Sequence, residues 1–450
     1  MDALLDQSAL TVLAERLLDA ARAAGADAAD AVVVRSVSQS VDVRDGQVEE
    51  SQRSEGDDVG LRVLVGHRQA LVSTNDIAGI PVKALAERAV AMARVAPEDP
   101  FVGLADRGRL ATGIANLDLI DGELASVARL EQLARSVEAA ALAVRGVTKC
   151  SGASAWSGIG GMVLATSHGF RGSYLSSRHG MSVEAIAGEG TTMESDHEYC
   201  SALHAADLRP TEEIGRNAGE RAVARLNPRK VETRRVPVVF EPRVAGSLVG
   251  HLAGGLNGSA VARKTSFLRE KLGQRVFSSG IRIWDDPLRP RGLQSRPFDA
   301  EGVAGARRAM VEDGVLTSWF LDSTTARELG LATTGHAHRG VSSAPSPGPT
   351  NLYLEAGEQS PEDLIAGIAD GLYITDLIGM GVNQVTGDYS RGAAGFWIEN
   401  GQKTYPVSEV TIAGHLFDIF RTMTPANDLS FRYGTNAPTL RVEGLTVAGR

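Results

Sequence analysis

The 450-residue sequence has almost no cysteine and no long apolar run. Its two cysteines, Cys150 and Cys200, cannot build a disulfide framework. No apolar run approaches the ~18 residues of a membrane-spanning helix, so we expect no membrane segment. The first residues, MDALLDQSAL, carry acids where a signal peptide needs a basic start and an apolar core. These absences favour a cytoplasmic protein.

Charge and apolar content further limit the class of protein to which the chain can belong. The chain has 46 basic and 55 acidic residues, a net charge of −9. This balance argues against a nucleic-acid or anionic-membrane surface, which needs clustered lysine and arginine. Apolar residues make up 43% of the chain, enough for a large core and for two or three domains at roughly 100–200 residues each.

Apolar residues recur at helical spacing in some segments and at every second position in others, and this succession predicts an α+β fold. Helical spacing occurs at about 8–25, 80–95, 122–144 and 211–225, and alternating segments between them predict strands. Hairpin turns are expected at three dipeptides: Asp45-Gly46, Asp313-Gly314 and Asn400-Gly401. The polar segment LNPRKVETRR predicts a boundary between an N-terminal α+β domain, 1–226, and a glycine-rich, β-dominated domain, 227–450. We expect mostly antiparallel sheets with flanking helices in two domains.

The segment 246–259, GSLVGHLAGGLNGS, has the spacing of a buried helix and one histidine, His251. A zinc-peptidase helix needs a second histidine about one turn away and a glutamate beside the first. Neither is present here. Two interpretations of His251 stay open: a hydrogen-bonded helix histidine, or a metal ligand that acts with His336 or His338 of the sequence HAH.

The segment TGDYSRGAAG places a polar cluster beside glycines, as a loop that approaches a ligand closely requires. We predict that Asp388, Ser390 and Arg391 contact a ligand or partner; the alternative is an Asp–Arg pair that holds the loop together. The glycines Gly379 and Gly381 lack the third glycine of a dinucleotide-binding fingerprint.

Five segments together resemble the TldD/PmbA family, also described as modulators of DNA gyrase, and most of all its PmbA (TldE) branch. They are TGDYSRGAAGFWIENGQKTYPVSEVTIAGHL, SPGPTNLYLEAGE, LGLATTGHAHRG, PFDAEGV and GHLAGGLNGSAVARKTSFL. The resemblance implies a two-domain α+β fold and a cytoplasmic metallopeptidase assembly in which TldD-type and PmbA-type chains pair. Such assemblies degrade unfolded peptides and trim a peptide precursor.

The resemblance also implies a departure in this chain. In the TldD branch a helix carries H-E-x-x-x-H, and a later cysteine completes the metal site. Aligning the helices places Val249, Gly250 and Gly254 at the His, Glu and His positions, and no cysteine follows Cys200. We therefore expect no metal cofactor in this chain, with zinc or a similar divalent metal in the partner.

Three functions follow. The first is a metal-free subunit that holds unfolded peptide and pairs with a TldD-like chain, or with a second copy of itself. The second is a self-sufficient metallopeptidase that uses His251 with His336 or His338. The third is a regulatory interaction protein without proteolytic activity.

Overall fold

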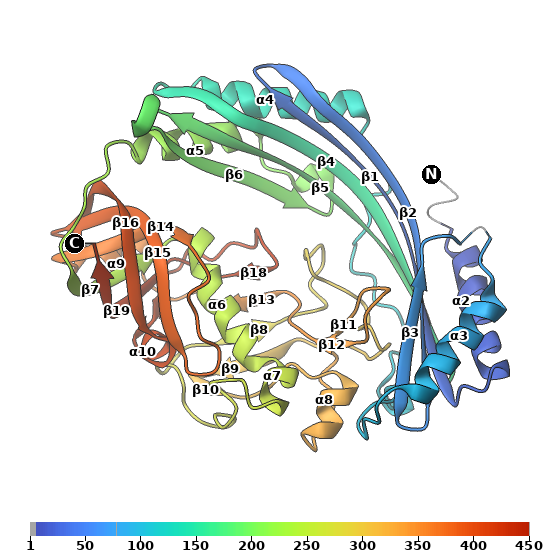
Figure 1. Ribbon diagram of the computed structural model, residues 1–450. Helices are drawn as coiled ribbons and strands as arrows, with labels where there is room; N and C mark the ends of the chain where they lie inside the picture. Colours follow the sequence, from blue (N-terminus) through green and yellow to red (C-terminus); the bar gives the residue numbers. More distant parts are fainter. Residues whose placement is uncertain (1–5, 78, 450) are drawn as a thin grey trace.

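The computed structural model describes residues 6–77 and 79–449 and confirms the α+β class, with mostly antiparallel sheets (Figure 1). The first five residues, on which part of the leader prediction rests, lie outside the described residues. Among the helices described, none is long and apolar enough to span a membrane.

A six-stranded antiparallel sheet dominates the N-terminal half and bends into an arch (Figure 1). Its order is β3-β2-β1-β4-β5-β6. The predicted turn at Asp45 and Gly46 is confirmed, since both residues have positive φ, 51° and 67°. The strands are β1 (Ala28–Arg44), β2 (Gln47–Val65), β3 (Arg68–Thr74), β4 (Val147–Thr166), β5 (Arg171–Ala187) and β6 (Glu194–Ala202).

Strand alternation gives the arch two different faces. Odd-numbered apolar residues of β1 pack under helices: Ala31 and Val33 under α2 (Ser8–Ala23) and α3 (Val82–Val95), Val41 and Val43 under α4 (Val127–Leu142) and α5 (Thr211–Ala224). On the opposite face, Val32 packs with Phe298 of the C-terminal half. The concave face of the arch therefore looks onto the second half of the chain (Figure 1).

One helix begins later than its periodicity predicts. We expected the helix from about residue 122, but α4 begins at Val127. Ser126 is its N-cap, and the Ser126 side chain accepts a hydrogen bond from the Arg129 backbone N–H.

The C-terminal half contains a mixed sheet in the order β16-β15-β14-β7-β19-β17. Strand β16 also pairs with β19, which closes β16, β15, β14, β7 and β19 into a ring. The turn at Asn400-Gly401 joins β15 to β16 as predicted. The strands are β7 (Arg234–Phe240), β14 (Asp370–Ile378), β15 (Asp388–Glu399), β16 (Gln402–His415), β17 (Thr424–Pro425) and β19 (Leu440–Ala448).

A second sheet, in the order β10-β9-β8-β13-β18, and a two-stranded sheet of β11 and β12 complete this half. The predicted turn at Asp313-Gly314 joins β9 to β10. The remaining strands are β8 (Ile283–Asp285), β9 (Arg308–Glu312), β10 (Val315–Leu316), β11 (Ala337–His338), β12 (Ser346–Pro347), β13 (Leu352–Leu354) and β18 (Thr435–Asn436). The helices are α6 (Pro242–Leu256), α7 (Gly258–Ala262), α8 (Ser323–Glu328), α9 (Pro361–Ala366) and α10 (Leu416–Thr422). Short 3-10 turns lie at Arg107–Arg109, Gly190–Thr192 and Ala205–Asp207.

Buried charges join the two halves. Asp30 on β1 accepts hydrogen bonds from Arg62 on β2 and from Arg339, which follows β11. The side chains of all three residues are at most 3% exposed. Burial opposes ionisation of Asp30, but Arg339 and Arg62 together hold its pKa below the ordinary value. Beside this cluster the Val341 carbonyl lies so close to Gly60 that a Cβ there would overlap it.

We predict that Asp30→Asn destabilises the fold by about 3–5 kcal/mol, because it leaves two guanidinium groups buried without their carboxylate. The free energy of unfolding from urea denaturation checks this value. Glu55→Gln is the control, since Glu55 pairs with Arg53 at 63% and 54% side-chain exposure and should change little. Equal losses in the two variants would contradict a structural role for the buried cluster.

Candidate functional site

Helix α6 forms the base of the candidate site and is held in place by its apolar side. Pro242 occupies its first turn, where the missing N–H costs no hydrogen bond. Leu248, Leu252 and Leu256 recur every four residues and are fully buried. They anchor the helix to the core of the C-terminal half, beneath the arch of the N-terminal sheet (Figure 1).

The opposite side of α6 is open and carries glycine. Gly250 and Gly254 are exposed and stand one helical turn apart. A Cβ on Gly250 would meet no atom within 4 Å, and one on Gly254 would meet the side chain of Gln384 at 3.1 Å. Val249, in contrast, is 2% exposed and packs into the core. The helix thus presents bare backbone to the open side.

His251 sits at the edge of this open side, against β15. Its ring makes an edge contact with Tyr389, with 5.8 Å between ring centroids. Its Nε2 atom is buried and has no hydrogen-bond partner among the described residues. Burial first, and then the positive charge of Arg391, lowers the pKa of His251 to about 4. The imidazole is therefore neutral at neutral pH.

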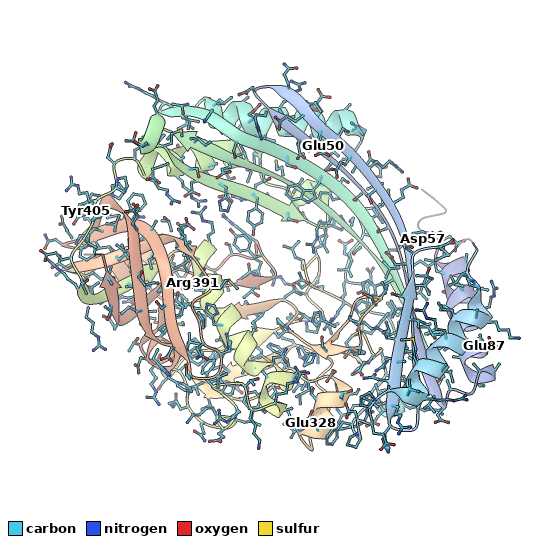
Figure 2. All side chains as sticks on the ribbon, viewed as in Figure 1. Glu50, Asp57, Glu87, Glu328, Arg391 and Tyr405 are labelled. Carbon is cyan, nitrogen blue, oxygen red and sulfur yellow. The ribbon has the colours of Figure 1, made fainter. Side chains whose placement is uncertain are left out.

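Strand alternation separates the three polar residues that the sequence groups together. Asp388 and Ser390 are exposed on one face of β15, whereas Tyr389, which contacts His251 of α6, lies on the other. Arg391 shares the face of Tyr389 (Figure 2). Asp388 accepts a hydrogen bond from Thr386 Oγ1 at 2.6 Å. Arg391 donates to the carbonyls of two residues of β14, Leu377 at 3.3 Å and Ile378 at 3.4 Å. The alternative of an Asp388–Arg391 pair was therefore wrong: the arginine holds the end of β14 instead.

The loop that joins β14 to β15 adds apolar surface and further unpartnered polar atoms. Met380 is 93% exposed and Ile378 is 61% exposed. Gln384 Oε1 and the Tyr389 hydroxyl are buried without hydrogen-bond partners in the described part of the chain, as is His251 Nε2. A ligand with apolar side chains, such as a peptide, could cover the exposed Met380 and Ile378. Sequence reasoning missed Gln384 and Met380, which lie in the loop between β14 and β15.

The side chains on α6 do not fit a metal ion. Valine and glycine have no donor atom, so positions 249, 250 and 254 offer no ligand. His336 is engaged elsewhere: its Nε2 lies 3.0 Å from Asp285 Oδ1 and its Nδ1 lies 2.9 Å from Thr334 Oγ1. Across residues 6–77 and 79–449 no three His, Cys, Asp or Glu side chains form a group that could hold a metal. The alternative set of His251 with His336 or His338 is thus not assembled.

At the arch, the side chains of a serine, a histidine and an aspartate form a row in which each lies close to the next. Ser157 Oγ lies 3.0 Å from His179 Nδ1, and His179 Nε2 lies 3.3 Å from Asp121 Oδ2. Ser157 and His179 are 1% and 2% exposed, and Ser157 also accepts a hydrogen bond from the Ala125 backbone. The group has no access for a substrate, so it holds the segment before α4 to the sheet.

Comparisons with known proteins agree with this architecture along the whole chain. Three family models match: PmbA/TldA metallopeptidase domain 1 at 29–93, the central domain at 121–226 and the C-terminal domain at 233–449. Metalloprotease PmbA of Escherichia coli O157:H7 is 37% identical over 94% of this chain and 93% of that protein. The Metalloprotease PmbA homolog of Haemophilus influenzae is 35% identical over 96% and 94%.

Solved structures show the same fold. A candidate modulator of DNA gyrase from Bacteroides thetaiotaomicron has a TM-score of 0.91 at 28% identity and covers 98% of this chain and 99% of that chain. TldE from Thermococcus kodakarensis has a TM-score of 0.85 over 97% and 99% of the two chains, at 21% identity. The second likeness concerns the fold alone.

We predict that His251 makes stability depend on pH. Its folded pKa of about 4 lies below the ordinary 6.5. Between these values the unfolded chain binds more protons, so the free energy of unfolding should rise as pH rises through this window and fall as pH drops towards 4. Denaturation series from pH 4 to 7 should show a smaller slope for His251→Gln. Tyr389→Phe is the control, because a phenol does not titrate there; an unchanged slope in His251→Gln would contradict the prediction.

Proposed function

The chain belongs to the PmbA/TldD metallopeptidase family, and from this premise we propose that it is the non-catalytic, peptide-holding subunit of a metallopeptidase assembly. The observation that carries the proposal is the open side of α6. Metal-assisted peptide hydrolysis needs three protein ligands, an open coordination position and a base that takes a proton from water. Gly250 and Gly254 supply none of these groups.

The catalytic metal then comes from a partner. A second copy of this chain would bring the same donor-free helix, so we favour a TldD-type chain with the H-E-x-x-x-H helix over a homodimer. The family resemblance supports this choice. The self-sufficient alternative lacks a ligand set, and no feature of the described residues favours a purely regulatory role.

This subunit would hold extended peptide along the open side of α6 and the β14–β15 loop. Main-chain hydrogen bonds give affinity without strong sequence preference, which suits unfolded substrates. Met380 and Ile378 would cover apolar side chains of the peptide. Arg391 would line the peptide side of β15, whereas the exposed Asp388 and Ser390 would face the partner.

We predict that this chain alone does not cleave an unstructured peptide and that mixing it with its TldD-type partner restores cleavage. Fluorogenic peptide turnover by the separate and mixed chains measures this directly. The control is a partner whose metal-site glutamate is replaced by glutamine, which should abolish turnover in the mixture. If the chain alone cleaves as fast as the mixture, the proposal is wrong.

We also predict that Gly250→Phe lowers peptide cleavage by the mixture at least about tenfold, because the ring fills the side of α6 where peptide would lie. The variant should fold, since a Cβ at Gly250 meets no atom within 4 Å. Gly108→Phe is a matched control: Gly108 is also exposed with nothing within 4 Å of an added Cβ, but it lies in the short turn Arg107–Arg109. Equal peptide cleavage by the Gly250→Phe and Gly108→Phe mixtures would show that peptide does not bind along α6.

A further inference from the structure

A separate cavity lies between the concave face of the arch and the segment 292–300. Its volume is about 270 Å3. Strand β5 contributes Tyr174, Ser176 and Arg178, and the C-terminal half contributes Arg296, His338 and Arg339. None of its described lining residues is acidic, although the chain as a whole carries a net charge of −9.

Two of the lining arginines are buried with free hydrogen-bond donors. Arg296 is 8% exposed, and its Nε and Nη2 atoms have no partner in the described part of the chain. The side chain of Arg339 is fully buried; its Nη1 binds Asp30, but its Nε and Nη2 atoms are likewise unpartnered. A buried guanidinium group with unmet donors is costly, so this arrangement calls for an acceptor.

Nearby carboxylates do not meet this need. Asp30 is shared by Arg339 and Arg62. Asp299 accepts hydrogen bonds from the backbone N–H groups of Glu301, Val303 and Ala337, which leaves its oxygens engaged. Burial raises the pKa of Asp299 above its ordinary value, and the charge of Arg296 opposes this shift. The described lining of the cavity therefore carries positively charged side chains and no carboxylate.

The remaining polar groups favour an oxyanion as well. His338 Nε2 is buried and unpartnered, and burial followed by Arg296 lowers the pKa of His338 to about 4, so the ring is neutral. Arg178 donates to the Leu293 carbonyl at 2.8 Å, which brings its guanidinium group to the mouth of the cavity. Water could fill the space and accept from these donors, but it would leave the charge uncompensated.

We propose that this cavity is a subsite for a carboxylate, namely the C-terminal carboxylate of a peptide. The planar guanidinium group of Arg296 matches the two oxygens of a carboxylate, and Arg178 adds a second cation at the mouth. Arg339, whose side chain is fully buried, contributes charge rather than a contact. A volume of about 270 Å3 holds one terminal residue rather than a long chain. The identification of the ligand as a peptide rests on the proposed function. The binding of an anion in this cavity does not depend on it.

Calorimetric titration of the isolated chain tests the proposal without any catalytic partner. The probes are N-acetyl-Ala-Ala with a free carboxylate, the same dipeptide as its C-terminal amide, and inorganic phosphate. We expect the acid to bind and the amide to bind at least about tenfold more weakly, a difference of about 1.4 kcal/mol. If phosphate binds and the peptide acid does not, a peptide as the source of the anion is overturned. If none of the three binds, the subsite itself is overturned.

Variants locate the binding. Arg296→Met should abolish binding of the acid while leaving the midpoint of urea denaturation unchanged or higher, because an uncompensated buried charge is removed. Arg178→Gln, at the cavity mouth, provides a second variant that should fold in any case and weaken binding. Arg308→Met is the matched control, since Arg308 also has an unpartnered buried Nε but does not line the cavity. Equal binding of the peptide acid by the wild type, Arg296→Met and Arg178→Gln would overturn the subsite. Failure to restore peptide cleavage on mixing with a TldD-type partner would instead count against the proposed function and not against the subsite.

Discussion

Buried ion pairs hold the two halves of this molecule together, and in the most deeply buried of them Asp30 lies between the guanidinium groups of Arg62 and Arg339. The carboxylate comes from the first strand of the arch, and one of its partners follows β11, more than 300 residues later in the chain. A cluster of this kind tolerates little movement, because each displaced charge would remain buried without its partner. Gly60 lets the backbone of Val341 come into direct contact with the sheet. Together these contacts hold the concave face against the C-terminal half, and Arg339 belongs both to this cluster and to the lining of the cavity.

Helix α6 shows how packing on one side can hold a helix whose open side carries Gly250 and Gly254. The helix contains several glycines, each of which costs up to about 1 kcal/mol relative to alanine in a helix interior. Three fully buried leucines on the other side offset this cost through burial of roughly 1.5–3 kcal/mol each. Packing therefore retains the helix whatever its open side carries. Glycine on that side keeps the space free for a chain that approaches the backbone.

Local sequence signals predicted much of the fold and little of the site. The turns at Asp45-Gly46, Asp313-Gly314 and Asn400-Gly401 are confirmed, because positive φ is required at residues that the sequence itself supplies. The closure of the ring by β16 and β19 could not be predicted from the sequence, because it depends on a pairing between strands that are not neighbours in the chain. Asp388, Ser390 and Arg391 were chosen by proximity in sequence, but the period of two places them on opposite faces of β15. The arginines of the cavity were missed because Arg178, Arg296 and Arg339 come from three separate segments.

Among the described residues with buried polar atoms that lack a partner, those around α6 and those at the cavity differ in charge. Around α6 the unmet atoms of His251, Gln384 and Tyr389 are neutral, so any partner with donors and acceptors would satisfy them. In the cavity the unmet atoms of Arg296 and Arg339 are cationic, so only an acceptor that also brings negative charge removes the electrostatic cost. An extended peptide offers both kinds of partner, with amides along its length and one carboxylate at its end. Function is expected where buried polar groups lack partners within the protein. Here the unpartnered atoms around α6 are neutral and those of the two arginines at the cavity are charged, which matches the amides and the terminal carboxylate of a peptide.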